Sequence, residues 1–321
     1  MDVKTISVNK LAWKLAENLI NNQEYYGVKV CKTTAGATVI DAGINAPGGY
    51  QAGLALTEIC LGGAGQAKID FKHYGEYEVP SVIITTDFPA VAALGSQFAG
   101  WRIKDGDNIA ICSGPARALA LKPKDLYAEL NFKDTSDRAV VCIESNVLPS
   151  DAVVEKVAVG CNVKPENIML LVAPTASIAG LVQVVGRIVE TGIHKLHNCG
   201  LDPKEIQYAS GYAPLPALSA DFEVAMARTN DVLLYGGVVH YIVDMEDEAK
   251  LQSILAQAPS CAASNYGKPF LEIFREADRD FYKIDTKLFA PAMLMINNKR
   301  TGKTLKAGQI NPKVLATSLG F

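Results

Sequence analysis

Residues 168–186, IMLLVAPTASIAGLVQVVG, contain no charged side chain over a length that is sufficient to cross a bilayer. Pro174, Thr175 and Ser177 interrupt this apolar run near its middle. The part before them is typical of a buried strand, and the part after them begins at residues that commonly cap a helix. The pattern therefore predicts a buried strand that leads into a helix, and it disfavours a transmembrane segment.

The same alternation of strand-like and helix-like segments continues along the chain. Helices are predicted at residues 8–22, 48–63, 89–101, 150–162, 176–197 and 217–229. Strands are predicted at residues 66–74, 81–87, 108–114, 138–146, 167–173, 206–210 and 232–243, with hairpins at 28–44 and 292–311. Because helices and strands alternate, the predicted fold class is α/β.

The length of 321 residues, 49% of them hydrophobic, suits two domains of ordinary size. Polarity rises briefly at residues 132–138, between two apolar strands. We therefore predict a first α/β domain at residues 1–135 and a second at residues 136–321. Whether the C-terminal hairpin packs on the first domain is left open.

Charge and cysteine usage limit the partners and the compartment. The net charge is −3 and the lysines are scattered, so we expect neither nucleic-acid binding nor a membrane partner. The seven cysteines form no C-x-x-C motif and most lie in apolar runs, as expected for reduced thiols in the cytoplasm. Residues 1–19 contain charges throughout and no apolar signal core, which also predicts a cytoplasmic protein.

Several cofactor motifs are incomplete in this sequence. The segment RTGKT, residues 300–304, resembles the end of a phosphate-binding loop, but Asn297 stands where that loop needs its first glycine. No G-x-G-x-x-G motif opens a helix after a strand, which argues against a nicotinamide enzyme. Glu190 and His194 share a helix face, but His197 points elsewhere and a third ligand is missing. We expect neither a metal ion nor a cofactor.

A narrow polar stripe marks the predicted helix at residues 176–197. On a helical wheel, Gln183, Arg187, Glu190, Thr191 and His194 fall on one side, and apolar residues cover the rest. One interpretation is a surface ion pair between Arg187 and Glu190, worth a few tenths of a kcal/mol. The other is that the stripe lines a cleft between domains, where a carboxylate orients or deprotonates a water molecule. The wheel alone does not decide between them.

Segments along nearly the whole chain resemble one enzyme family. They are GATVIDAGINAPGGYQAG (36–53), EICLGGAG (58–65), GSQFAGW (95–101), CSGPARAL (112–119), GRIVETGIHKL (186–196), RTNDVLLYGG (228–237) and YGKPFLEIFREADRDFYKIDTKLFAPA (266–292). In this order they resemble the methenyltetrahydromethanopterin cyclohydrolases. Several of the segments are long and unusual in composition, which makes chance agreement improbable.

The resemblance implies a fold, an assembly and a reaction. The fold is two α/β domains with the pterin in a cleft between them, and the assembly is a homotrimer. The reaction is the reversible hydrolysis of 5,10-methenyltetrahydromethanopterin to 5-formyltetrahydromethanopterin. The methenyl carbon lies between two nitrogens that share a positive charge, so it is electrophilic without a metal. Whether the enzyme works in methanogenesis, methane oxidation or formaldehyde oxidation stays open.

The resemblance also assigns roles to residues. Glu190 corresponds to the acid/base glutamate, and Arg187 to the arginine that orients it and adjusts its proton affinity. Six further residues are expected to contact the pterin: Ser113, Arg117, Ser145, Asn146, Tyr235 and Phe289. Each has a structural alternative, which is a tight turn with Arg117 in solvent for the first two, strand capping for the next two and core packing for the two aromatic residues.

Two other functions are compatible with the same residues. One is another one-carbon pterin enzyme, and the other is a non-catalytic pterin-binding protein in which Arg187 and Glu190 form only an ion pair. The presence of both residues at the spacing found in the family argues against the second.

Overall fold

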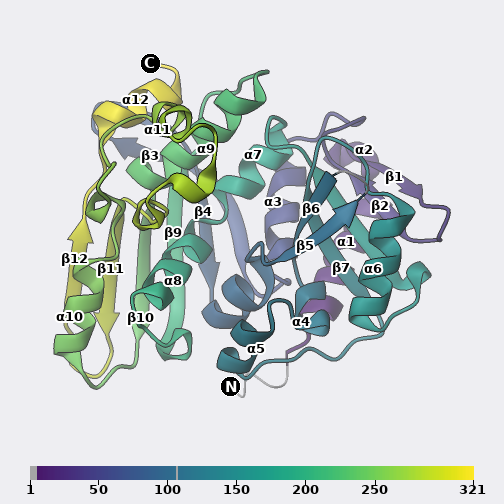
Figure 1. The fold of residues 1–321 in the computed structure, drawn as a ribbon, viewed down its shortest axis with the longest axis horizontal. Coiled ribbons are helices and arrows are strands. Elements are labelled where there is room, and N and C mark those ends of the chain that lie inside the picture. Colours follow the sequence, from purple (N-terminus) through teal and green to yellow (C-terminus); the bar gives the residue numbers. More distant parts are fainter. Residues whose placement is uncertain (1–5, 106–107) are drawn as a thin grey trace. The chain divides into compact units, whose positions relative to one another are not determined.

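The computed structural model describes residues 6–105 and 108–321, which form two compact units (Figure 1). The first unit comprises Met1–Gln66 and Ala90–Gln183, and the second comprises Ala67–Pro89 and Val184–Phe321. Each unit contains one mixed six-stranded sheet with helices, so the predicted α/β class is confirmed. Residues 1–5, part of the segment used above to predict the compartment, lie outside the described residues.

The sheet of the first unit has the strand order β1-β2-β8-β7-β6-β5. Its strands are β1 (Lys29–Lys32), β2 (Thr38–Asp41), β5 (Trp101–Asp105), β6 (Asn108–Ser113), β7 (Ala139–Glu144) and β8 (Ile168–Ala173). The central strands β2, β8 and β7 are parallel and almost wholly buried. This explains their continuous apolar sequences, because a central parallel strand is covered on both faces.

Helices cover both faces of this sheet. They are α1 (Val8–Asn21), α2 (Gln23–Tyr26), α3 (Tyr50–Cys60), α4 (Ala116–Ala120), α5 (Lys124–Leu130), α6 (Asp151–Cys161) and α7 (Ile178–Val185), with a π-helix at Ala90–Gln97 and a 3-10 turn at Pro165–Asn167. Ile40 and Leu171 pack with α1 and α3 on one face, whereas Val39 and Leu170 pack with α6 on the other. Alternate residues of each strand therefore serve two separate cores.

The sheet of the second unit has the order β12-β11-β10-β9-β4-β3. Its strands are β3 (Gln66–Tyr74), β4 (Tyr77–Thr86), β9 (Ile206–Pro214), β10 (Val238–Val243), β11 (Met293–Asn298) and β12 (Thr304–Gly308). Strands β10 and β11 are parallel, and β9 joins β10 to β4 by antiparallel pairing. The predicted C-terminal hairpin thus forms the β11–β12 end of this sheet.

The helices of the second unit lie between and after its strands in the sequence. They are α8 (Ile188–Asn198), α9 (Phe222–Gly236), α10 (Glu248–Ala256), α11 (Phe270–Glu276) and α12 (Pro312–Leu319), with 3-10 turns at Pro203–Glu205, Ser260–Ala262, Phe281–Lys283 and Thr286–Leu288. Val239, Tyr241 and Leu294 face the buried side of the sheet, whereas Ile242 and Met295 on the opposite side are only half-buried. One face of this sheet is therefore less covered than the other.

The uncharged run at residues 168–186 forms β8 and α7, as predicted. The Ser177 hydroxyl accepts a hydrogen bond from the backbone N–H of Gly180 at 3.0 Å and so caps the first turn of α7. None of the helices in the described parts of the chain combines the length and apolar character needed to cross a membrane.

Three sequence predictions about secondary structure are wrong. The helix expected at residues 176–197 is interrupted at Gly186, and it forms α7 and α8 instead. The segment at residues 89–101 is a π-helix that ends at Gln97, and Trp101 begins β5. The first half of the strand expected at residues 232–243 belongs to α9, because a short apolar run fits a buried helix as well as a strand.

The boundary expected between residues 135 and 136 lies inside the first unit, between the paired strands β6 and β7. The chain passes between the two units at residues 66–67, 89–90 and 183–184. The β3–β4 hairpin therefore belongs to the second unit, although residues of the first unit precede and follow it.

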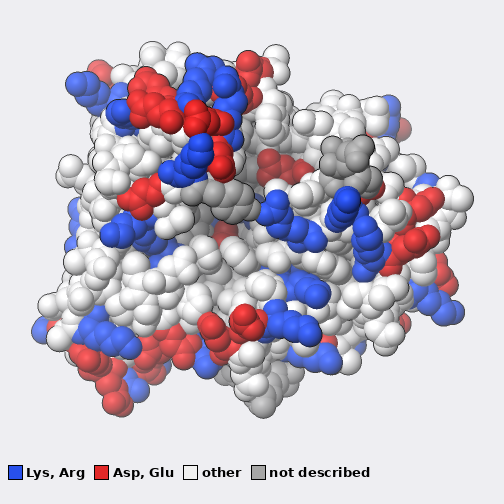
Figure 2. Space-filling view, in the orientation of Figure 1, with Lys and Arg blue, Asp and Glu red and all other residues white. Residues whose placement is uncertain are grey.

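Basic and acidic side chains are interspersed on the face drawn in Figure 2, in keeping with the small net charge.

Candidate active site

Arg187 and Glu190 lie at the start of α8. The backbone N–H of Arg187 donates to the carbonyl oxygen of Val184 at 3.1 Å, which closes the tight turn between α7 and α8. The carbonyl oxygen of Arg187 then accepts from the backbone N–H of Thr191 at 2.8 Å, the first hydrogen bond of the new helix. Glu190 is in the first turn of α8, where the helix dipole stabilises a negative charge.

This break changes the interpretation of the polar stripe. The wheel assumed one continuous helix, so its placement of Gln183 beside Arg187 does not apply across the turn. Glu190 is only 7% exposed and Arg187 is half-buried, and each takes part in a polar or electrostatic interaction. This burial does not fit a solvent-exposed surface pair.

The turn that carries Glu190 is fixed from β10. The Tyr241 hydroxyl donates to the carbonyl oxygen of Val189 at 3.0 Å. Gly192 is needed for this approach, because a Cβ atom at residue 192 would collide with that hydroxyl and would lie 3.2 Å from Cγ of Pro291. The pKa of Tyr241 is well above its usual value, mainly because of burial and secondly because of the Glu190 carboxylate. Tyr241 is therefore a permanent hydrogen-bond donor.

Further along α8, His194 and Lys195 are ionisable groups in low-polarity surroundings. Burial lowers the pKa of His194, and the neighbouring His197 and Lys195 lower it further, so the imidazole is mostly neutral near pH 7. Lys195 is 5% exposed, and its Nζ donates to the carbonyl oxygen of Lys287 at 3.1 Å. Within residues 6–105 and 108–321, no three His, Cys, Asp or Glu side chains are grouped to hold a metal ion.

Ser113 lies at the end of β6, as predicted, but its side chain faces the interior. The residue is 3% exposed, and its hydroxyl donates to the carbonyl oxygen of Cys142 at 3.2 Å. The Sγ atom of Cys60 lies 3.3 Å from the same hydroxyl. These contacts hold the Ser113 hydroxyl in the interior of the first unit, which differs from the tight turn expected as its alternative.

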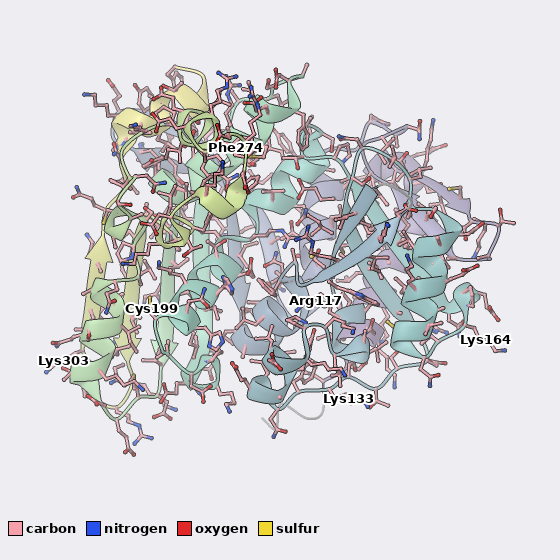
Figure 3. The ribbon with its side chains drawn as sticks, in the orientation of Figure 1. Arg117, Lys133, Lys164, Cys199, Phe274 and Lys303 are labelled. Carbon is pink, nitrogen blue, oxygen red and sulfur yellow. The ribbon has the colours of Figure 1, made fainter. Side chains whose placement is uncertain are left out.

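Arg117, which is labelled in Figure 3, lies on α4 in the first unit. Its side chain is fully buried. Its Nε donates to the carbonyl oxygen of Lys122 at 2.9 Å, and its Nη1 donates to those of Leu94 and Ser96 at 3.1 and 3.2 Å. The guanidinium also lies 5.6 Å from the ring centre of Tyr127. Because Nε and Nη1 both donate to backbone carbonyls, these contacts support a structural role for Arg117. Its burial differs from the alternative expected above, in which the side chain lies in solvent.

Ser145 and Asn146 directly follow the carboxyl end of β7, which confirms their predicted place in the sheet. The Ser145 hydroxyl donates to the carbonyl oxygen of Val147 at 2.8 Å and accepts from its N–H at 3.0 Å. Asn146 is exposed. The structure thus commits the Ser145 hydroxyl to a local turn and leaves the Asn146 side chain at the surface.

The two aromatic candidates differ in burial. Tyr235 is fully buried in α9, and its hydroxyl donates to the carbonyl oxygen of Lys268 at 2.5 Å. Phe289 is half-buried, with its ring centre 5.9 Å from that of Phe270 and 6.2 Å from that of Phe281. Only Phe289 of the two keeps part of its ring accessible, so core packing fits Tyr235 better.

Comparison with known proteins places these features in a family. The family model described as Cyclohydrolase (MCH) matches residues 7–319. The chain belongs to the MCH cyclohydrolase family. It is 45% identical to the methenyltetrahydromethanopterin cyclohydrolase of Methanocaldococcus jannaschii, over 98% of this chain and 99% of that protein. The proteins of the same name from Methanospirillum hungatei and Methanothermobacter marburgensis are 44% and 43% identical over 98% of this chain, and 99% and 100% of their own lengths are covered.

In this cyclohydrolase, the sequence did not predict the contacts of three residues on or against α8, which are Tyr241, Gly192 and Lys195. Lys195 follows His194 on a helix in which six of the eleven residues are polar, so the sequence offered no clear signal for a buried amine. Tyr241 gave no such signal, because its contact with Val189 joins residues 52 positions apart.

Proposed function

We propose that this protein hydrolyses the 5,10-methenyltetrahydromethanopterin cation reversibly to 5-formyltetrahydromethanopterin, as a step of one-carbon metabolism. The match to relatives of that name over nearly their full length carries the proposal. The buried carboxylate of Glu190 at the start of α8 supports it, since the reaction needs one positioned acid/base group.

In the proposed mechanism, water adds to the electrophilic methenyl carbon and forms a C–O bond as it transfers a proton to Glu190. Glu190 then returns that proton to N10 while the C–N10 bond breaks. The carbinol hydroxyl loses its proton as the formyl C=O forms, so one proton is released overall. Arg187 orients the carboxylate and favours its ionised form, because an adjacent guanidinium stabilises a negative charge.

The test of this function follows the absorbance of the methenyl pterin in the presence of the pure protein. We expect wild-type turnover, and a decrease of about 10²-fold or more in kcat for Glu190→Gln, in line with the usual contribution of acid/base catalysis. Glu155→Gln on α6 is the control, because Glu155 is exposed and lies in the other unit. A spectral shift without turnover would indicate a pterin-binding protein instead of an enzyme.

The role of Arg187 is tested separately. Arg187→Ala should lower kcat and leave the fold intact, because the residue is half-buried and precedes the first turn of α8. Circular dichroism and the thermal midpoint monitor the fold. An unfolded variant would show that Arg187 is structural.

The proposed reaction needs no metal or cofactor, since the substrate carbon is already electrophilic. Activity should therefore survive extensive dialysis against a chelator. A loss of activity that is restored by a divalent cation would contradict this part of the proposal.

We also propose that the protein is a cytoplasmic homotrimer, as its family resemblance implies. The half-buried side chains on one face of the second sheet, with Tyr208 52% exposed, support association through that unit. Sedimentation equilibrium should give three times the mass of one chain. A monomeric mass at micromolar concentration would exclude the trimer.

A further inference from the structure

Lys195 is a buried ammonium group on α8, five residues after Glu190. Burying an amine is costly unless it is hydrogen-bonded, and burial lowers the pKa of Lys195. Its Nζ donates to the backbone carbonyl of Lys287 at 3.1 Å. The amine thereby links α8 to a segment 92 residues away in the sequence.

Further hydrogen bonds hold the segment around Lys287, to which Lys195 donates. Asp285 caps the 3-10 turn Thr286–Leu288 by accepting from the N–H of Lys287 at 3.0 Å. Its other oxygen accepts from the N–H and the hydroxyl of Ser264 at 3.1 and 3.0 Å. These hydrogen bonds lower the pKa of Asp285, so the carboxylate stays ionised and partly offsets the effect of burial on the Lys195 ammonium.

A second contact holds the same segment against α8. Gly192 lies close to Pro291, such that a Cβ atom at residue 192 would be 3.2 Å from Cγ of the proline. The segment therefore meets α8 at Lys195 through Lys287 and at Gly192 through Pro291. Phe289 lies between Lys287 and Pro291 in the sequence, and therefore between these two contacts along the segment.

We propose that Lys195 is a positioning residue for the pterin. Its hydrogen bond to Lys287 fixes residues 287–291 along α8 and so sets the place of the half-buried Phe289 ring relative to the Glu190 turn. An aromatic ring held there offers a face for a flat cationic ring system. The inference rests on the proposed function, because it assigns Phe289 to substrate binding.

The experiment compares steady-state constants for methenyl pterin hydrolysis. Lys195→Met keeps an unbranched side chain that is one atom shorter and removes the donor, so KM should rise about 10-fold while kcat changes less than about 3-fold. Lys195→Arg retains a donor and should recover at least half of the lost affinity on a logarithmic scale. Lys306→Met on β12 is the matched control, because it removes an exposed lysine of the same unit, and both constants should stay at wild-type values.

A double-mutant cycle tests whether Lys195 acts through the aromatic ring. Phe289→Leu should also raise KM, and the two effects should be strongly non-additive in Lys195→Met/Phe289→Leu. Additive effects would overturn the proposal, as would an unchanged KM in Lys195→Met. If Lys195→Met does not fold, Lys195→Arg provides the test. A Lys195→Arg variant that folds poorly but has the wild-type KM would also overturn the proposal.

Failure of this inference can be distinguished from failure of the proposed function. Wild-type turnover together with an inactive Glu190→Gln supports the function regardless of Lys195. An unchanged KM in Lys195→Met would then reject only the positioning role.

Discussion

The hydroxyl of Tyr241 donates a hydrogen bond to the carbonyl oxygen of Val189, the residue directly before Glu190. This bond connects the centre of β10 with the first turn of α8. Because Tyr241 is fully buried and its pKa is well above the usual value, the hydroxyl stays protonated and donates at all ordinary pH values. This hydrogen bond thus holds the Glu190 turn in a fixed position against the sheet.

Tyr241→Phe tests this connection. Removal of the hydroxyl eliminates one buried hydrogen bond and should lower the free energy of unfolding by about 1 kcal/mol. We also expect kcat to decrease several-fold, because the turn of Glu190 is held less firmly. Urea denaturation and initial rates measure the two effects, and a variant with wild-type kcat would show that the hydroxyl contributes to stability alone.

Gly192→Ala should be destabilising although alanine normally favours a helix by roughly 1 kcal/mol over glycine. A methyl group at this position collides with the Tyr241 hydroxyl, and overpacking of this kind typically costs about 1–3 kcal/mol. The thermal midpoint should fall. Gly200→Ala provides a contrast. Gly200 has a positive φ of 99°, and a Cβ atom there would have no neighbouring atom within 4 Å, so the strain of that variant comes from the backbone alone. An increase in stability for Gly192→Ala would contradict the packing described here.

Most strands and about half of the α-helices could be predicted because their signals are local. β8, for example, is an apolar run that ends at Pro174, and α1 begins after Ser7, whose hydroxyl accepts from the N–H of Lys10. The break between α7 and α8 was not predicted, because a single Gly186 is tolerated in many helices. The sequence predicts a strand at Tyr235 for a similar reason, since the run VLLYGG has no period that separates a helix from a strand.

The candidate site was predictable only in part. The resemblance pointed to Arg187 and Glu190, and the structure adds the burial of Glu190 at a helix start. The inward orientation of Arg117 could not be read from the sequence, because its acceptors belong to Leu94, Ser96 and Lys122, which no local pattern connects to it. Contacts between distant segments were the missing information in each case.

Arg117→Lys should disrupt the first unit even though it keeps the charge. A lysine has no planar fork and cannot reproduce hydrogen bonds to three carbonyl oxygens from Nε and Nη1. Since hydrogen bonds to charged groups contribute about 1.5–3 kcal/mol each, we expect a loss of at least about 3 kcal/mol in the free energy of unfolding. Denaturant titration measures this loss. A stable variant with altered substrate affinity would instead support contact with a ligand.

Asp231 should make stability depend on pH. This carboxyl group on α9 is buried, and it accepts hydrogen bonds from the N–H of Phe270 and the hydroxyl of Ser318, both at 2.7 Å. Burial outweighs these bonds and raises the pKa of Asp231 from 3.8 to about 7. The folded state therefore binds the proton more tightly than the unfolded state does, and the contribution of Asp231 to stability is lost as pH rises from about 4 to about 7.

Asp231→Asn removes this titration, so the decline in stability between pH 4 and pH 7 should be smaller in the variant. Urea midpoints at several pH values in this range measure the difference. Parallel pH profiles for the two proteins would show that Asp231 has the same proton affinity in the folded and unfolded states.

The sheet of the second unit also has a consequence for synthesis on the ribosome. Strand β4 ends at Thr86 and pairs with β9, which begins at Ile206, so 119 residues lie between the two strands. At usual translation speeds of about 5–20 residues per second, β4 waits roughly 6–24 s for its partner. During this time, one edge of the β3–β4 hairpin is an unpaired template for other nascent chains. Slow translation or low temperature would lengthen that exposure, and a chaperone that shields strand edges would be most useful before residue 214 is made.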